Sequence, residues 1–438
     1  MDFRFYTPAV IYINNIVSEH MTVLHSWLFR LFETSGIPDP VRLFVSVIYQ
    51  QVTGIAYQSH YSEIYPETKA WYTDTVPLYG ADKIKQCISM ITGGMPAWKL
   101  IMFQSFLLRK RCPDLLIPSG GKPGDTGNET ADFDASVLQS SSSQKEGSVP
   151  GFNKKNKGKP CFQLSATFIG RIFADVKLFP GDSNPKIFFQ KAVNRVISLG
   201  YGIKIIRADS AYMTPENLLF LTKRGLGYAI GAPGTFSAVK EAVRKFRNLS
   251  RLKSSAIISV AKGISVYDSG MTTLRNGIRT RIIAVRRISR RKNRRTGKWK
   301  IKTYYYAISS NLSLSPRKLY EFYHKRQCIE AGFRELKQQW NLERLPFEKL
   351  IHNEFWILCK ITAMTLFKIF QTETLPKKYQ TLQRGTFFRR IFLKGLRIGG
   401  SAGKVGIVPK GPYTWLLRRL LSKTARMNTA LYVYLTDC

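Results

Sequence analysis

Apolar residues recur every three or four positions along the first third of the chain, with glycine or proline at the breaks between the runs. This spacing places apolar side chains on one face of an α-helix. We therefore predict a helical N-terminal region over residues 1–125, with helices within 21–36, 41–54, 84–94 and 97–111. The last of these carries four cations beside its apolar face: Lys99, Arg109, Lys110 and Arg111. Such a region suits DNA-end binding, and a solvated basic helix end is the equal alternative.

The pattern changes after residue 125, where a polar interval rich in glycine and serine surrounds one alternating segment, residues 131–139. Alternation predicts a strand, and it places Asp132 and Asp134 on the same face. From Cys161 two strand-like runs turn at Gly170, and a helix, a strand ending at Asp209, a second helix and a short strand follow. This order predicts an α/β sheet layered with helices over residues 126–231.

The residue pattern over 232–312 predicts a β-rich insertion. Three runs within it, 264–273, 280–289 and 300–310, are rich in β-branched and aromatic residues, and a polar loop with a glycine turn joins the last two. Ten Lys or Arg residues lie between positions 286 and 302. So many cations in one hairpin favour phosphate binding over a loop that is basic by chance. The candidates are Arg290, Arg291, Arg294 and Arg295.

A further helix is predicted from Pro316 to Trp340, with Ser315 as its N-cap and proline at its first position. At 100° per residue one stripe of this helix carries Tyr323, Arg326, Glu330 and Lys337, within an arc of about 60°. A neighbouring apolar stripe, Phe322, Ile329, Phe333 and Leu336, is expected to pack on the sheet. Spacing alone is equally consistent with an ordinary surface helix in which Arg326 pairs with Glu330. Glu321 and Glu335 lie off the polar stripe, so we expect both to be solvated.

The amino-acid composition excludes several classes of protein and favours one kind of partner. The 438 residues include 68 Lys and Arg against 28 Asp and Glu, a formal net charge of +40. Such a surplus predicts a polyanionic partner, with nucleic acid ahead of an anionic membrane surface. Six scattered cysteines without a CxxC pair, together with five histidines, argue against zinc or disulfide scaffolds and suit a reducing compartment. The most apolar stretch, residues 355–370, contains Lys360 and Lys368 and predicts an amphipathic core helix, not a membrane span.

The spacing from Tyr323 through Arg326 and Glu330 to Lys337 resembles the YREK signature of DDE-type insertion-sequence transposases, and YHKRQCIEAGFRELK matches it without a gap. IIRADSAYMTPENLLFLTKRGLGYAI is similar to the family's second-aspartate block. ADFDASVL, followed by GFNKKNKGKPCFQLSATFIG, resembles the first-aspartate block, and the C-terminal TFFRRIFLKGLRIGGSAGKVGIV is similar to the tail of one branch. The resemblance covers roughly residues 130 to 420.

The resemblance implies a ribonuclease H-like mixed sheet with flanking helices, interrupted by the β-rich insertion. Residues 126–231 and 313–375 would form the catalytic domain, and 376–438 a basic C-terminal region. It also implies a catalytic and metal-binding triad of Asp134, Asp209 and Glu330, with Asp132 as the alternative first ligand. Phosphodiester chemistry needs two divalent cations about 3.5–4 Å apart, and hard Mg²⁺ (or Mn²⁺) prefers carboxylate oxygens.

The cationic and aromatic residues of the motif would bind DNA. Tyr323, Arg326 and Lys337 would hold phosphates as a neutral donor, a planar fork and a point charge. Trp299, beside the basic loop, would stack on an unpaired base, as an aromatic residue does in some relatives, or pack across the strands.

We therefore expect a transposase that binds the inverted-repeat ends of an insertion sequence, cleaves them with metal ions and joins them to target DNA. Its partner would be double-stranded DNA, bound by a homodimer at paired ends, in the bacterial cytoplasm and associated with the nucleoid, without a membrane. The alternatives are a ribonuclease H-like nuclease without strand transfer and a catalytically degenerate nucleic-acid-binding protein.

Overall fold

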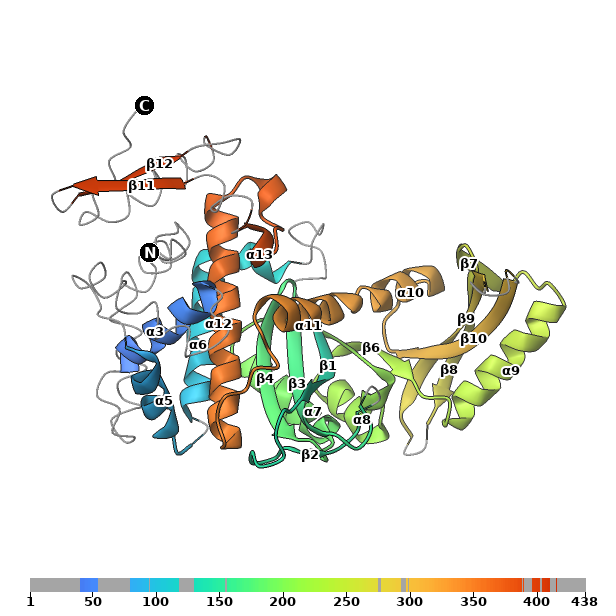
Figure 1. Ribbon diagram of the computed structural model, residues 1–438. Helices are drawn as coiled ribbons and strands as arrows, with labels where there is room; N and C mark the ends of the chain where they lie inside the picture. Colours follow the sequence, from blue (N-terminus) through green and yellow to red (C-terminus); the bar gives the residue numbers. More distant parts are fainter. Residues whose placement is uncertain are drawn as a thin grey trace.

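The structure is a computed structural model, and its elements alternate between strands and helices in the predicted order through the middle of the chain (Figure 1). It describes residues 40–53, 79–93, 95–117, 130–153, 156–274, 277–292, 297, 299–387, 389, 396–401, 404–409 and 415. The predicted helix within 21–36 lies outside the described residues.

The core of the sheet has the predicted ribonuclease H-like topology. Its strands are β1 (Thr130–Gln139), β2 (Val149–Pro150), β3 (Pro160–Ile169), β4 (Ile172–Pro180), β5 (Ile205–Ala208) and β6 (Gly227–Ala232). β3 pairs antiparallel with β1 and with β4, whereas β5 is parallel to both β1 and β6. Gly170 makes the β3–β4 turn with φ +57°, a conformation that glycine adopts without strain. The spatial order β4–β3–β1–β5–β6 confirms the predicted mixed sheet.

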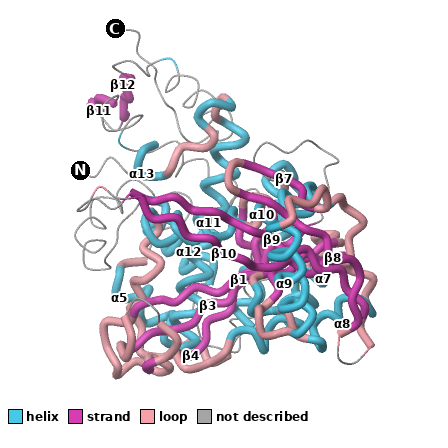
Figure 2. Tube along the Cα trace, turned by 90° about the vertical axis from the view of Figure 1, so that its right-hand side faces the viewer, coloured by secondary structure: helices cyan, strands magenta, loops and turns pink. Residues whose placement is uncertain are grey.

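The insertion extends this sheet instead of forming a separate layer. Its strands are β7 (Ile257–Ala261), β8 (Ile264–Thr273), β9 (Arg279–Lys292) and β10 (Trp299–Ser310). The last residues of β10 pair with β6, and β9, β8 and β7 follow in order. The insertion also contains helix α9 (Ser237–Arg251), which the sequence analysis did not single out. In the turned view of Figure 2 this part of the sheet and α9 face the viewer.

Helices cover the core sheet. α7 (Phe189–Ser198) and α8 (Pro215–Lys223) follow β4 and β5, and α10 (Pro316–His324) and α11 (Gln327–Gln339) run from the insertion back across β1 (Figure 1). Short 3₁₀ turns lie at Pro113–Leu116, Pro185–Phe188, Ser210–Tyr212 and Lys377–Tyr379. At the far end of the described chain α13 (Arg384–Phe387) precedes a two-stranded sheet of β11 (Leu396–Ser401) and β12 (Lys404–Pro409).

The described N-terminal helices pack beside β4 around one long helix. They are α3 (Pro40–Thr53), α5 (Ala81–Ser89) and α6 (Met95–Arg111), and the long helix is α12 (Leu350–Thr374). Arg111, one of the predicted basic residues of α6, pairs with Glu373 of α12 at 3.2 Å. α12 is buried on nearly every side, so the predicted amphipathic character is wrong. Even Lys360 is buried, donating to the carbonyls of Asn341 and Arg344, and burial lowers the pKa of this lysine to about 7.

Among the described helices none combines the length and the apolarity that crossing a bilayer requires.

Candidate active site at the end of strand β5

Two of the three expected carboxylates lie level on adjacent parallel strands. β1 and β5 pair in a register that sets Phe133 opposite Ala208, so the next residues, Asp134 and Asp209, fall side by side where β5 ends. Asp209 caps the following 3₁₀ turn by accepting hydrogen bonds from the backbone N–H and the hydroxyl of Ser210. This is the edge of a sheet at which α/β proteins place their ligands.

The Arg326 guanidinium lies against Asp134. It donates to Oδ2 of Asp134 at 2.8 Å and to Oε1 of Glu330 at 3.2 Å. Burial raises the pKa of Asp134 and the charge of Asp209 adds to the rise, while Arg326 opposes it. Burial alone would lower the pKa of Arg326, but the nearby Asp134, Tyr323 and Asp209 raise it above its ordinary value. The guanidinium thus balances the negative charge that the two strands bring together.

Glu330 stands at the rim of this group. Its side chain on α11 is 52 % exposed, and an ion pair with Arg326 connects it to the site. Within the described part of the chain no three His, Cys, Asp or Glu side chains stand close enough to hold one metal ion. The structure therefore brings Asp134 and Asp209 together directly and links Glu330 to them through Arg326.

Asp132, the alternative first ligand, lies deeper in the same strand face. Arg207 of β5 holds both of its carboxylate oxygens in a two-pronged contact at 2.7 Å. The side chains of Arg207 and Asp132 are 4 % and 2 % exposed, and the thiol of Cys328 also contacts Asp132, at 3.1 Å. Both oxygens of Asp132 are therefore already engaged, whereas Asp134 lies beside Asp209.

The sequence analysis missed Arg207, although a signal was present. A cation between the apolar Ile206 and Ala208 of a buried strand needs a buried partner. The third contact of Arg207 is to the carbonyl of Phe322, at 2.8 Å. The same side chain therefore ties the two central strands to the end of α10.

The predicted single helix over residues 316–340 is in fact two helices. Ser315 caps α10 as expected, by accepting a hydrogen bond from the N–H of Lys318. The chain tightens at Lys325 and Arg326. The N–H of Lys325 is shared between the carbonyls of Glu321 and Phe322, and the N–H of Arg326 donates to Tyr323, three residues back. The Phe322 carbonyl, which would accept from the N–H of Arg326 in an unbroken helix, accepts from the Arg207 guanidinium and from the N–H of Lys325. The helical pattern did not predict this break because its cause, Arg207, lies on strand β5, far away in the sequence.

Although the helix is broken between α10 and α11, the residues of the polar stripe still contact the candidate site or β1, each in a different way. The Tyr323 ring lies close to β6, where a Cβ on Gly231 would come within 2.7 Å of the phenol oxygen. Burial raises the pKa of Tyr323, with Asp209 and Asp134 adding to the rise. Lys337 donates to the Val137 carbonyl of β1 at 2.7 Å and pairs with Glu343 at 3.1 Å. Tyr323 thus faces the aspartates, and Lys337 ties α11 to β1.

The apolar stripe and the two control glutamates give a mixed outcome. Ile329, Phe333 and Leu336 are buried as predicted, and Phe322 lies under the guanidinium of Arg207. Glu321 is exposed and pairs with Arg317. The expectation for Glu335 is wrong, because this side chain is only 24 % exposed and accepts a hydrogen bond from Lys368 of α12 at 3.0 Å.

The tip of the basic hairpin is only partly described. Arg290 is exposed near the end of β9 and lies opposite Ile301 of β10. Arg291 belongs to β9, its side chain being among those not described, and Arg294 and Arg295 lie outside the described residues. Trp299 is 66 % exposed at the start of β10, so it does not pack in the core.

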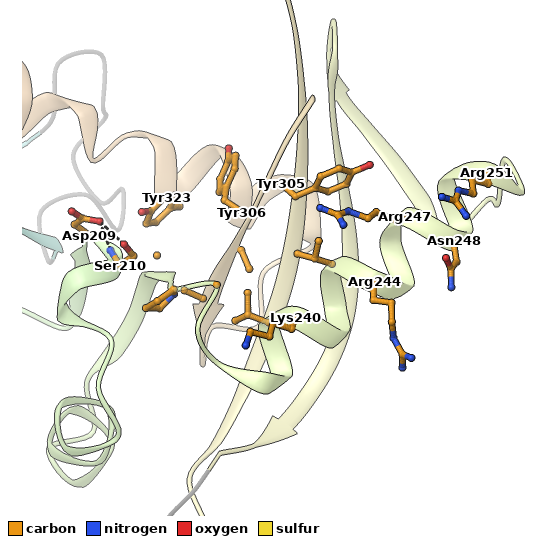
Figure 3. Close-up of a pocket in the computed structure, with 17 residues that line it drawn as sticks. Asp209, Ser210, Lys240, Arg244, Arg247, Asn248, Arg251, Tyr305, Tyr306 and Tyr323 are labelled. Atoms are coloured by element: carbon orange, nitrogen blue, oxygen red, sulfur yellow. Dashed lines mark hydrogen bonds between the residues drawn. The ribbon is translucent and has the colours of Figure 1, made fainter. Parts of the chain in front are cut away.

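A cavity of about 640 Å³ opens beside Asp209 and runs along α9 (Figure 3). Its lining includes Ser210 and Tyr323 near the aspartate and a row of cations on the helix. Sequence reasoning missed this row. The signal was four cations at helical spacing with one acidic residue in the same segment: Lys240, Arg244, Arg247 and Arg251.

The family model described as "Transposase DDE domain" matches residues 125–366. No curated protein matches the chain. Among solved structures, the cryo-EM structure of the piggyBac transposase synaptic complex with hairpin DNA is similar with a TM-score of 0.38 and 10% identity, over 90% of this chain and 77% of that chain. The family match covers more than half of the 438 residues, including Asp134, Asp209 and Glu330, and the chain therefore belongs to the transposases with a DDE domain.

Proposed function

We propose that the protein binds the ends of an insertion sequence, cleaves DNA strands there with the help of divalent metal ions and joins the 3′-ends to target DNA. Asp134, Asp209 and Glu330 are its catalytic and metal-binding residues. The observation that carries the proposal is the register of β1 and β5, which sets Asp134 level with Asp209 at the end of β5. Membership of the DDE family already implies a polynucleotidyl transferase or nuclease.

The side-by-side carboxylates of Asp134 and Asp209 suit a divalent metal ion such as Mg²⁺ or Mn²⁺, and two ions are proposed. Glu330 would have to approach from the rim to complete the ligand set. The donor atoms are carboxylate oxygens, which hard cations prefer. Two half-buried aspartates side by side also require a compensating cation, as the raised pKa of Asp134 and its contact with Arg326 indicate. When bound, the ions would activate the attacking oxygen and stabilise the leaving oxygen of the phosphodiester.

The chain's own cations and hydroxyls would position the DNA. Arg326 presents a planar fork that suits two phosphate oxygens, and Tyr323 presents a neutral hydroxyl, whose pKa burial raises further above neutrality. Lys337 fixes α11, and hence Glu330, against β1 through its bond to Val137. In this proposal Tyr323, Arg326, Glu330 and Lys337 act as the YREK motif of an insertion-sequence transposase.

The remaining parts of the chain would contact DNA. Residues 126–231 and 313–375 would form the catalytic domain, 232–312 the insertion and 376–438 a basic C-terminal region. Residues 1–125 would bind element ends. A net charge of +40 supports a double-stranded DNA partner, both inverted-repeat ends and target. Pairing of two ends would need two copies of the chain, and the protein would act on the bacterial nucleoid in the cytoplasm.

The test uses the DNA that flanks the coding region. Duplexes carrying both flanks are incubated with the protein and Mg²⁺, with EDTA and Asp209→Asn as controls. We expect strand cleavage at inverted repeats and joined products that carry a short target duplication. Cleavage without joined products would instead identify a nuclease, and binding without cleavage a degenerate transposase. Cleavage that persists in EDTA would refute the metal-dependent mechanism.

A further inference from the structure

Helix α9 has one buried face and one strongly cationic face. Val239, Ala242 and Phe246 are buried against the strands of the insertion. The other face carries cations at spacings of four, three and four residues, within an arc of about 60°. They are Lys240, Arg244, Arg247 and Arg251, which we call the α9 stripe. With a rise of 1.5 Å per residue, the stripe is about 16 Å long.

The charges of the α9 stripe form no ion pair with a carboxylate in the described part of the chain. The acidic residue of the helix, Glu241, pairs with Lys245 at 2.9 Å, and Lys245 lies off the stripe. In the described part of the chain no ion pair involves any of the four stripe residues, and all four are exposed. Cations this close repel one another, so a bound anion with several charges would relieve the repulsion.

The stripe leads to the candidate active site. The cavity of about 640 Å³ has Asp209 and Ser210 at one end and the α9 stripe along one wall, with tyrosine rings between them (Figure 3). Asp209 is the one carboxylate among its lining residues. A cavity of this size suits a ligand comparable to a small drug, roughly one or two nucleotides, and is too small for a duplex.

The aromatic residues of the cavity suit the bases of such a ligand. The rings of Tyr305 and Tyr306 stand between the stripe and Tyr323. The Arg247 guanidinium lies over the Tyr305 ring, 4.8 Å from its centre, so two planar groups are already stacked at this point of the stripe. Sites for single strands combine a cationic track for phosphates with such stacking surfaces.

We propose that the α9 stripe binds the phosphates of one DNA strand as this strand leaves the reacting phosphodiester at Asp209. The inference rests on the proposed function for the position of the reaction, and it adds a binding track for single-stranded DNA on an element outside the YREK motif. Arginine forks and the Lys240 ammonium contact successive phosphates along the helix, and the tyrosines contact the bases.

The test measures binding without catalysis. The variant Lys240→Gln/Arg244→Gln/Arg247→Gln/Arg251→Gln is titrated against a fluorescent single-stranded oligonucleotide in EDTA, over a series of salt concentrations. Four lost contacts should lower the slope of log K against log salt by about 3, since each contributes about 0.7 on a single strand. The double variant Arg244→Gln/Arg251→Gln should show about half of that change.

A matched control removes the same charge elsewhere. The exposed cations of the α7–α8 region are replaced in the variant Lys186→Gln/Lys191→Gln/Lys223→Gln/Arg224→Gln. We expect the control to keep the slope within about 1 of the unmodified protein. Equal changes in both four-residue variants would overturn the proposal, as would a loss seen with duplex DNA but not with the single strand. Because EDTA prevents metal-dependent cleavage, this result is independent of whether Asp209 and Glu330 prove catalytic.

Discussion

The charges of the candidate active site and those of the α9 stripe are organised in opposite ways. Around the end of β5 each cation faces carboxylates, as Arg326 faces Asp134 and Glu330, and Arg207 faces Asp132. On α9 the four stripe residues are exposed and have no ion-pair partner in the described chain. Without DNA, the ion pairs at the end of β5 fix the geometry of the candidate site, whereas the unpaired cations of the stripe already face solvent, where a polyanion can approach.

Burial explains why the two regions differ. The side chains of Arg207 and Asp132 are almost completely removed from water, where an unpaired charge costs several kcal/mol. The side chains of α9 remain in water, so their charges cost little while DNA is absent. Among the described residues, the buried charged side chains are three acidic (Asp132, Asp175 and Glu354) and three basic (Arg207, Lys360 and Arg384), so they balance in number.

Removal of one aspartate should have the largest effect on activity. Asp209→Asn keeps the shape of the side chain but loses the charge that we assign to metal binding. We expect DNA cleavage to fall by about a thousandfold or more, with DNA binding nearly unchanged. Cleavage assays at saturating DNA, with binding measured separately, check this expectation.

Glu321→Gln is the matched control, because this carboxylate is exposed on α10 and pairs only with Arg317 in the described chain. Asp134→Asn should behave like Asp209→Asn. If Asp134→Asn cleaves normally while Asp132→Asn unfolds or loses cleavage, the assignment of the first ligand is wrong.

Disruption of the buried ion pair should destabilise the fold more than any change on the insertion. Arg207→Met leaves Asp132 buried without its cation, and we expect a loss of about 3–5 kcal/mol in the free energy of unfolding. The double variant Arg207→Met/Asp132→Leu should recover most of this loss, since both charges are then absent. Urea unfolding measures both, and equal stability of the single variant and the unmodified protein would show that the pair is not a structural element.

A smaller effect is expected when the planar guanidinium of Arg326 is replaced by the compact ammonium group of lysine. Arg326→Lys keeps the charge but cannot contact Asp134 and Glu330 with a planar fork. We expect cleavage to fall about 10- to 100-fold, equivalent to about 1.4–2.7 kcal/mol of transition-state stabilisation. Single-turnover rates test this, and full activity of Arg326→Lys would reduce the role of Arg326 to that of a simple counter-charge.

The smallest change is expected at the basic hairpin. Arg290 is exposed near the end of β9, and its replacement by Gln should remove one phosphate contact. The salt slope of duplex binding should fall by about 0.9. Lys191→Gln, on α7, serves as the control, and an identical slope in Arg290→Gln and the unmodified protein would mean that this arginine is only solvated.

Much of the fold could be predicted because its signals are local. Alternation in residues 131–139 and the apolar run before Asp209 identify strands that the structure contains. Ser315 and Pro316 mark the start of α10 at the residue where the helix begins. The order of strands and helices then favours one mixed sheet, since these periodicities depend only on near neighbours in sequence.

The residues of the candidate site could be predicted from the sequence, but the way in which they are arranged in space could not. Sequence alone left Asp132 and Asp134 as alternatives, because both lie on one face of β1. The pairing register of β1 with β5 gives the two aspartates different environments. It sets Asp132 opposite Arg207 and Asp134 level with Asp209. The break between α10 and α11 has the same origin, since Arg207 takes the Phe322 carbonyl from 115 positions away.

The sequence by itself therefore determined the order of elements, the excess of cations and the residue types available for chemistry. Only the tertiary structure decided which charges neutralise one another and which remain free. Arg326 meets Asp134 across 192 positions of chain, and the α9 stripe meets Asp209 across a cavity. The reason is physical: helix and strand periodicity act over a few neighbouring residues, whereas the strength of a charge interaction depends on distance and burial in the folded chain.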